Sequence, residues 1–333
     1  MRAITQEKYG SSDVLKLTEV EQPTVQDDTV LVRVQATSIN AGDWHLMRGD
    51  PFLVRLMLGG ILKPKIKTIG FDVAGRVEAV GKGISRFQVG DKVFGDLSEC
   101  GFGAFAEYAN ATEDALSIKP EKLTFEEAAA IPGAGLTALQ ALRNVGKVQP
   151  GQRVLIVGAS GGVGSYAVQI AKAFGAEVTA VCSRLKMERI SLLGADKVIE
   201  YAQLNLTEKD AYDLVVDVAA YRSVFDYLPA LKPGGTYVLV GGAIARLFQV
   251  MIFGSLISKM NNRTVKSLIV KPNSTDLAKL RELIEVGKII PLIDQLYSLE
   301  EVPVAIRRLE QRQVIGKLVI RVCELPSQGT YRT

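Results

Sequence analysis

The stretch Arg153-Val154-Leu155-Ile156-Val157-Gly158-Ala159-Ser160-Gly161-Gly162-Val163-Gly164 decides the fold of this chain. Its apolar, β-favouring residues lead directly into a glycine-rich turn. The next residues, 165–174, carry apolar side chains at helical spacing along one face. A strand, a glycine turn and a helix in this order are typical of a dinucleotide-binding unit.

The glycine turn offers a binding place for a pyrophosphate. The first turn of a helix has unpaired N–H groups and the positive end of the helix dipole, and glycines let a phosphate approach the backbone. Read as G-x-G-x-x-G, the first position is Ala159, whereas Gly158, Gly161 and Gly164 form a three-spaced set. We expect the cofactor to contact the residues at the helix start: Ser160, Gly161, Gly162 and Val163.

Length and composition indicate a globular protein of two domains. The chain has 333 residues, beyond the usual single-domain range of roughly 100 to 200. It is 47% hydrophobic and 23% charged, with a net charge of +4. This mild charge suits an anionic small ligand, and the cations are scattered, so we expect no nucleic-acid partner.

The three cysteines, Cys100, Cys182 and Cys323, lie far apart and include no C-x-x-C pair. Their spacing suits a reducing compartment and argues against a disulfide framework or a multi-cysteine zinc site. The N-terminal residues form no hydrophobic signal core, and no stretch reaches the roughly 18 to 20 apolar residues of a membrane span. We therefore expect a cytoplasmic protein.

The first 120 or so residues read as an all-β, barrel-like region. Short strands are expected at 30–34, 73–80 and 92–95, between Gly, Pro and Asp residues. Within this region the segment 51–67 is unusually apolar. We favour a packed helical insertion there, and the alternative is an apolar lid or wall over a binding cleft.

From Thr124 onward helices and strands alternate. Uniformly apolar strands are expected at 178–182, 197–199, 214–218, 237–240 and 265–270. Helices between and after them are expected near 187–193, 224–231 and 276–286. This alternation predicts a Rossmann-type, doubly wound parallel sheet, and hence an α/β protein. A last helix near 301–310 and a strand at 317–322 should pack back on the first domain.

The end of the second Rossmann strand distinguishes NAD from NADP. An acidic side chain there binds the ribose hydroxyls of NAD, whereas basic residues accept the 2′-phosphate of NADP. This chain has Ser183, Arg184 and Lys186 at that point and no carboxylate before Glu188. We expect NADP(H), bound by these three residues. Alternatively, the two cations are a solvated helix start.

Several motifs, in family order, resemble the medium-chain dehydrogenase/reductase superfamily, specifically its zinc-free quinone oxidoreductase and enone reductase branch, which includes plant chloroplast-envelope quinone oxidoreductase homologues. They are 36–44 (ATSINAGDW), 70–75 (GFDVAG), 89–93 (VGDKV), 128–138 (AAAIPGAGLTA), the glycine turn and 316–317 (GK). The resemblance covers nearly the whole chain. It implies a GroES-like β-barrel domain at 1–121 and 288–333, a Rossmann NADP(H)-binding domain at 122–287, and a homodimer.

Two departures from the zinc alcohol dehydrogenases bear on the chemistry. Those relatives have a cysteine where this chain has Asn40 and a histidine where it has Phe71. Neither replacement binds zinc as a thiolate or imidazole, so we expect no metal. The chemistry then left to a nicotinamide is hydride addition to an acceptor that is already electrophilic, such as a quinone or an α,β-unsaturated carbonyl.

The resemblance also assigns roles to single residues. The asparagine matching Asn40 sits beside the nicotinamide and substrate, so Asn40 is a candidate catalytic and cofactor-binding residue. Further cofactor contacts are implied for Thr137, Tyr201, Gly241, Gly242 and Lys317. Tyr201 would flank the 2′-phosphate, although it also fits a plain strand-end aromatic. Asp43 is expected to be a structural hydrogen-bond acceptor.

His45, the only histidine, is the second candidate catalytic residue. It stands where some relatives carry a cleft tyrosine, and it would supply a proton or an oxyanion contact. A structural histidine, with the proton coming from solvent, is the alternative.

Two apolar stretches, 52–62 and 247–258, have no role in these motifs. We rank three interpretations, in this order: walls of a pocket for a long apolar substrate, a subunit interface, and a peripheral contact with a membrane.

The sequence thus predicts an NADPH-dependent reductase of quinones or α,β-unsaturated carbonyls that uses no metal and takes a small, apolar substrate. The alternatives are a zinc-free alcohol or aldehyde dehydrogenase of the same superfamily and a non-enzymatic, crystallin-like NADPH-binding protein.

Overall fold

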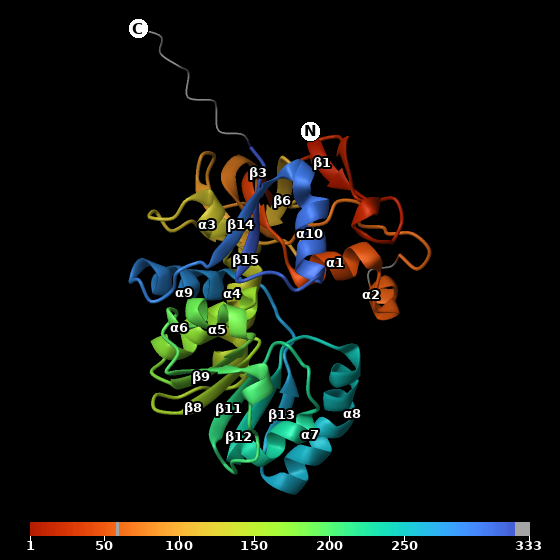
Figure 1. The fold of residues 1–333 in the computed structure, drawn as a ribbon. Helices are drawn as coiled ribbons and strands as arrows, with labels where there is room; N and C mark the ends of the chain where they lie inside the picture. The colour runs from red at the N-terminus through yellow and green to blue at the C-terminus, as the bar shows by residue number, and fades with distance from the viewer. Residues whose placement is uncertain (58–59, 324–333) are drawn as a thin grey trace. The chain divides into compact units, whose positions relative to one another are not determined.

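The glycine turn links β8 (Arg153–Val157) to α5 (Gly162–Ala173), the strand and helix expected there. They belong to one of two units in the computed structural model, which describes residues 1–57 and 60–323 (Figure 1). Unit 1 comprises 1–133, 272–281 and the segment from 293 onward, and unit 2 comprises 134–271 and 282–292.

Unit 2 is built on a six-stranded sheet in the order β10-β9-β8-β11-β12-β13, with every neighbouring pair parallel. Its other strands are β9 (Glu177–Cys182), β10 (Lys197–Glu200), β11 (Tyr212–Asp217), β12 (Leu231–Leu239) and β13 (Thr264–Ser267). Counted along the unit, this is the 3-2-1-4-5-6 order of a Rossmann sheet, with its switch point between β8 and β11. The predicted doubly wound sheet is confirmed.

Helices cover this sheet because both of its faces are apolar. In β8 the last four residues are buried, as expected for an inner parallel strand. Helix α5 packs on β8 and β9 through buried Tyr166, Ala167, Ile170 and Ala171. The remaining helices of unit 2 are α6 (Met187–Ser191), α7 (Val224–Tyr227) and α8 (Ile244–Asn261), and α8 packs on β12 and β13. Helices α4 (Pro132–Gln140) and α9 (Ser274–Glu285) each cross a unit boundary.

Unit 1 is the GroES-like barrel. Its main sheet runs β14-β15-β3-β4-β5-β7, with β6 also pairing with β3, and β1 and β2 form a separate hairpin. The strands are β1 (Arg2–Thr5), β2 (Lys16–Glu19), β3 (Thr29–Ser38), β4 (Asp72–Val80), β5 (Lys92–Asp96), β6 (Tyr108–Thr112), β7 (Leu116–Ile118), β14 (Ile293–Ser298) and β15 (Lys317–Arg321). All pairs are antiparallel except β14 with β15. The predicted strands at 30–34, 73–80 and 92–95 lie in β3, β4 and β5.

The C-terminal tail completes this barrel, as expected. Strand β15 pairs with β3, placing Val319 opposite Ser38 and Ile320 opposite Thr37. Helix α10 (Val302–Glu310) precedes it, while α1 (Ala41–Arg48), α2 (Phe52–Met57) and α3 (Phe125–Ala129) complete the helices of unit 1. Residues 324–333 of the expected C-terminal domain lie outside the described residues.

The packed helical insertion expected at 51–67 is present only in part. Among the described residues of this segment, 52–57 form a helix, α2, in which no residue is buried, although Val54 packs against the core of unit 1. Phe52, Leu56 and Met57 are 61%, 58% and 75% exposed, so their apolar side chains do not contribute to the core. Leu58 and Gly59 lie outside the described residues. In the part of the chain that is described, no helix is both long and apolar enough to cross a membrane.

Candidate functional site

The glycine turn of unit 2 is held in a fixed shape by its own backbone. The N–H groups of Gly158 and Ala159 both donate to the carbonyl of Val181, each at 3.0 Å. Gly158 has φ +87°, a conformation that side chains rarely adopt. A Cβ on Gly164 would lie 2.1 Å from the Gly158 carbonyl oxygen. Gly158 and Gly164 are therefore required by the turn and by the close packing of α5 against it.

At position 161, by contrast, neither the backbone conformation nor the packing within the chain requires a glycine. A Cβ there would meet only the Gly158 carbonyl oxygen, at the ordinary contact distance of 3.7 Å, and otherwise open space. Gly161 is also the N-cap residue of α5, next to the unpaired N–H groups of the first helical turn. The open space above Gly161 is the place that a pyrophosphate oxygen would occupy, so the residues present fit a dinucleotide. Ser160 lies beside it, 7% exposed.

A second glycine pair follows β12 at the same edge of the sheet. A Cβ on Gly241 would meet only the Val218 carbonyl oxygen, at 3.7 Å, and Gly242 has φ +106°. The neighbouring loop after β11 is fixed by Asp217, which accepts the Ala219 and Ala220 N–H groups and the Tyr237 hydroxyl. Burial raises the pKa of this carboxyl. Asp217, whose role the sequence did not indicate, thus shapes the loop between the two glycine segments.

The register of β9 and β10 brings together the residues expected at the adenosine end. Cys182 is paired with Glu200, so Ser183 and Tyr201 leave the sheet from neighbouring positions. Arg184 is exposed and Lys186 half-buried, in a short 3₁₀ turn after β9. Tyr201 packs edge-on against Tyr221, with ring centroids 5.1 Å apart.

Sequence reasoning missed two residues at this edge. Tyr221 lies in the loop after β11, and only strand order brings it near Tyr201. Glu200 is the carboxylate that the second strand lacks, supplied by the next strand through the parallel register.

Unit 1 contributes a buried polar cluster built around Asp72, the first residue of β4. Its Oδ2 accepts hydrogen bonds from the Ser38 hydroxyl at 2.5 Å, the Asn40 amide at 2.8 Å and the Lys317 ammonium at 3.0 Å. Its Oδ1 accepts the Gly133 N–H at 2.6 Å. The carboxylate thus joins β3, β4, β15 and the start of α4, and its charge is balanced by Lys317.

These partners fix the orientation of Asn40. Lys317 carries only donors and Asp72 only acceptors, so the amide oxygen must face Lys317, at 2.5 Å, and the amide nitrogen must face Asp72. The Asn40 backbone N–H donates to Asp43 Oδ2 at 2.7 Å, which makes Asp43 the structural acceptor that was expected. The second amide proton of Asn40 has no partner among the residues described here.

Lys317 is 3% exposed and points inward rather than toward solvent. Its three ammonium protons are used by the Ile39 carbonyl, Asn40 Oδ1 and Asp72 Oδ2. Direct contact with a cofactor, as the resemblance implied, would require one of these bonds to break. In this geometry Lys317 holds Asn40 in place.

Three carboxyl groups share the cluster with a single ammonium group. Burial raises the pKa of Asp43 well above its usual range. Burial, followed by repulsion from Asp72, raises the pKa of Asp96 from 3.8 to about 6. A Cβ on Gly133 would lie 3.0 Å from Asp72 Oδ1 and 3.3 Å from Asp96 Oδ2, so the two carboxyl groups face the same small space.

The remaining candidates lie on separate elements. The His45 ring stacks on Trp44 with centroids 3.9 Å apart, and its Nδ1 lies 2.6 Å from the Asp50 carbonyl oxygen. Because a carbonyl only accepts, Nδ1 carries the proton and Nε2 faces away from this bond. Thr137 is half-buried on α4, between buried Leu136 and Ala138.

The residues at the zinc alcohol dehydrogenase positions form no metal-binding set. Phe71 packs edge-on against Phe102, with centroids 5.0 Å apart, and also contacts the Gly42 position. Within residues 1–57 and 60–323 there is no group of three or more His, Cys, Asp or Glu side chains that could hold a metal ion.

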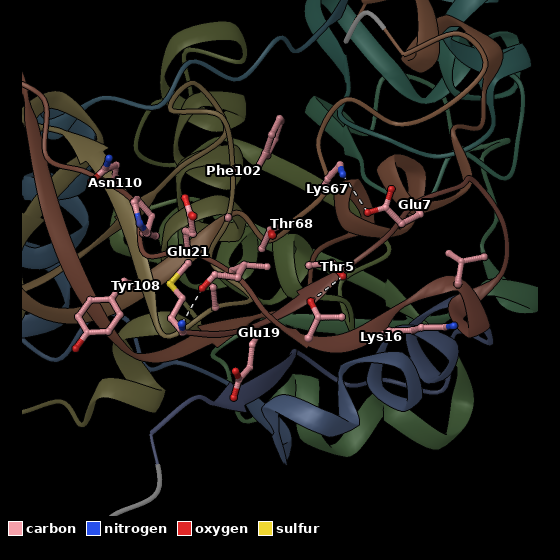
Figure 2. A pocket seen from close by; sticks show the side chains of 18 of the residues that line it. Thr5, Glu7, Lys16, Glu19, Glu21, Lys67, Thr68, Phe102, Tyr108 and Asn110 are labelled. Atoms are coloured by element: carbon pink, nitrogen blue, oxygen red, sulfur yellow. Dashed lines mark hydrogen bonds and ion pairs between the residues drawn. The ribbon is translucent and has the colours of Figure 1, made fainter.

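A groove of about 1040 Å³ lies on unit 1 beside the β1–β2 hairpin, lined by Thr5, Lys16, Lys67, Phe102 and Tyr108 among others (Figure 2). Neither Asn40 nor His45 lines it. Its charges are balanced, with four lysines against four acidic residues, and Lys67 is paired with Glu7 at 3.1 Å. We assign it no part in the chemistry.

A Rossmann unit with a pyrophosphate cradle, combined with a GroES-like barrel unit, defines a nicotinamide-dependent oxidoreductase. Comparison with known families agrees: residues 26–121 match the alcohol dehydrogenase GroES-like domain, and residues 193–320 match the zinc-binding dehydrogenase family. The chain belongs to the medium-chain dehydrogenase/reductase superfamily, in its quinone oxidoreductase and enone reductase branch.

Relatives across the whole chain support this placement. The chloroplast envelope quinone oxidoreductase homolog of Arabidopsis thaliana is 33% identical, covering 96% of this chain and 98% of that protein. The 2-methylene-furan-3-one reductase of Solanum lycopersicum is 34% identical over 96% of this chain and 79% of its own length. The solved quinone oxidoreductase of Coxiella burnetii is 30% identical, with a TM-score of 0.85 over 97% of this chain and 99% of that structure.

Proposed function

We propose that this protein reduces quinones or α,β-unsaturated carbonyl compounds with NADPH and without a metal ion. The observation that carries the proposal is the anchored amide of Asn40, held by Asp72 and Lys317 with one amide proton to spare among the described contacts. An amide in this position donates a hydrogen bond, whereas the thiolate of the zinc enzymes binds a metal.

The chemistry divides between the cofactor and the side chains. When bound, the reduced nicotinamide supplies a hydride. Asn40 would donate a hydrogen bond from its second amide N–H to the acceptor oxygen as that oxygen gains negative charge, and the buried ion pair keeps the amide from rotating. Phe71, half-buried against Phe102, gives this part of unit 1 an apolar surface that suits an apolar acceptor.

The choice of NADPH rests on Ser183, Arg184 and Lys186, which bring a hydroxyl and two cations to the end of β9. Glu200, which the register places beside Cys182, is an opposing charge at this edge. Two cations against one carboxylate favour a ligand with an additional phosphate. The mitochondrial relative in Bos taurus is named an NAD(P)H oxidoreductase, which supports a nicotinamide cofactor of either kind.

The proton that completes the reduction of an enone is assigned to His45 or to solvent. Since Nδ1 is bonded to the Asp50 carbonyl, the ring can donate from Nε2 only when both nitrogens carry protons. We further propose a cytoplasmic location, since the three cysteines are free and far apart in sequence, and a homodimer, as the family resemblance implies.

The test is an NADPH-oxidation screen across quinones, alkenals and long-chain enones, with NADP reduction by alcohols measured in parallel. Asn40→Ala is expected to lower kcat about 10²-fold, the scale of one lost oxyanion donor. The control, Asn144→Ala, removes an exposed amide whose oxygen accepts only from neighbouring Arg143 among the hydrogen bonds described.

The outcomes separate the candidate functions. Turnover of alcohols alone would favour an alcohol dehydrogenase, and tight NADPH binding without turnover would favour a non-enzymatic protein. Unchanged activity in Asn40→Ala would remove Asn40 from the mechanism.

A further inference from the structure

Helix α8 is apolar on both its inner and its outer side. Val250, Gly254 and Ile257 face the core of unit 2 and are buried. The outer side exposes large apolar residues: Leu247 38%, Phe248 49%, Met251 64%, Ile252 65% and Leu256 54%. A helix that is apolar on all sides is normally buried. A group of neighbouring, exposed apolar side chains therefore indicates a binding surface.

Helix α8 is attached to the start of α7 by side-chain hydrogen bonds. Gln249 donates to the Ser223 hydroxyl at 2.7 Å and accepts the Val224 N–H at 3.3 Å. Phe253 packs beside Phe225, with centroids 6.0 Å apart, which extends the apolar surface onto α7. The exposed apolar face of α8 therefore continues onto α7.

The stretch of sequence that contains α8 carries charges of one sign, and two of its cations are paired with acids from elsewhere in the chain: Lys232 with Asp213 at 2.8 Å and Arg263 with Asp210 at 3.0 Å. From Tyr227 to Thr275, 49 residues, the sequence contains no Asp or Glu and six Lys or Arg: Lys232, Arg246, Lys259, Arg263, Lys266 and Lys271. Arg246 lies in the first turn of α8 and Lys259 in the last, and neither forms an ion pair with a described residue. The acid nearest in sequence, Asp226, is engaged at the start of α7 with the Ser223 N–H.

We propose that the outer face of α8 binds the surface of a membrane containing anionic phospholipids. The apolar residues would enter the boundary between head groups and acyl chains, and the cations at both ends of the helix would meet lipid phosphates. A second copy of this chain fits less well. A twofold contact sets the same patch against itself and would bring cations of like charge together without acidic partners.

The experiment measures binding of the full chain to sucrose-loaded vesicles by sedimentation. One set of vesicles is phosphatidylcholine alone and the other also contains phosphatidylserine. The test variant is Met251→Glu/Ile252→Glu, and the control is Leu192→Glu, which places an acid on a side chain that is 81% exposed on another helix end. Because all three positions are exposed, we expect unchanged circular dichroism and thermal midpoints.

We expect the wild type to sediment with the phosphatidylserine vesicles and Met251→Glu/Ile252→Glu to lose at least about tenfold in binding. Leu192→Glu should bind like the wild type. Arg246→Gln/Lys259→Gln should lower binding only to the anionic vesicles. A Phe248→Trp variant should show a blue shift of its fluorescence on adding these vesicles.

Three results would overturn the proposal. The first is a wild-type protein that does not sediment with the phosphatidylserine vesicles. The second is equal binding by wild type and Met251→Glu/Ile252→Glu. The third is a shift from dimer to monomer in analytical ultracentrifugation for that variant while its vesicle binding persists, because the occupant of α8 would then be a second copy.

Discussion

Asp72 Oδ2 and Lys317 Nζ lie 3.0 Å apart inside unit 1, with side chains 0% and 3% exposed. The two residues come from β4 and β15, which are not neighbouring strands, because β3 runs between them. Asn40 follows β3 and bonds to both members of the pair. The position of the candidate catalytic amide is thus set by a buried ion pair.

Removing one member of this ion pair should lower the stability of the fold. In Lys317→Met the Asp72 carboxylate would be left buried without its counter-ion, so we expect a loss of about 3–5 kcal/mol in the free energy of unfolding. Urea denaturation measures it. Asp72→Asn/Lys317→Met, which removes both charges, should recover part of the loss. A single variant as stable as the wild type would show that the pair is not coupled in this way.

Asp96 predicts a pH dependence of stability. Below about pH 3.8 the carboxyl is protonated in both folded and unfolded chains, and between 3.8 and about 6 only the folded chain keeps the proton. The Asp96 contribution to the free energy of unfolding should therefore fall as pH rises through this window, by at most about 3 kcal/mol, and stay low above it.

Asp96→Asn isolates this contribution from the other acids. The stability of the variant relative to the wild type should rise between pH 4 and about 7, as measured by urea denaturation across that range. The Ser98 N–H, which bonds to Oδ1 at 2.8 Å, can keep an oxygen partner in the variant. A difference that does not vary with pH would mean that Asp96 titrates normally.

The fold followed from the sequence because its signals are local. Buried apolar strands alternate with helices after Thr124, and β8 and α5 begin and end close to where periodicity places them. The error at 51–67 has the same origin. Apolar residues normally indicate burial, and sequence alone cannot show that Phe52 and Met57 face outward.

The site was harder to predict, because its partners are distant in sequence. Asn40, the glycine turn and Ser183 were predicted as site residues from motifs and their spacing. The roles of Asp72 and Asp96 depend on how β3, β4, β5 and β15 are ordered, which no motif encodes. Likewise, only the parallel register of β9 and β10 places Glu200 beside Cys182, at the end of the strand where we expect the adenosine.

His45 can be tested as a proton donor by substitution. If Nε2 delivers the proton, His45→Gln should lower kcat for enone reduction about 10²-fold and leave NADPH binding unchanged. Steady-state kinetics and cofactor titration of both proteins are the measurements. An unchanged kcat would leave solvent as the donor.

Arg184 should select for the 2′-phosphate. Arg184→Ala is expected to weaken NADPH binding by about 1.5–3 kcal/mol, the scale of a charge-assisted hydrogen bond, with little change for NADH. Arg189→Ala, which removes another exposed cation from the following helix, should change neither. Calorimetric titration gives both affinities. Equal losses for the two cofactors would show that Arg184 does not read the phosphate.

Gly161 and Gly164 lie about one helical turn apart, but replacing each by alanine should have a different effect. A methyl at Gly164 meets the Gly158 carbonyl oxygen at 2.1 Å, so Gly164→Ala should lower stability by about 1–3 kcal/mol through overpacking. A methyl at Gly161 meets nothing closer than 3.7 Å, so Gly161→Ala should fold normally. The added methyl group would instead occupy the space expected for the pyrophosphate and weaken the binding of NADPH and NADH alike, by roughly tenfold or more.

Thermal unfolding and cofactor titration of both variants separate the two effects. If Gly161→Ala bound both cofactors as tightly as the wild type, the open space above α5 would not be the pyrophosphate site, and the cofactor assignment of this turn would be wrong.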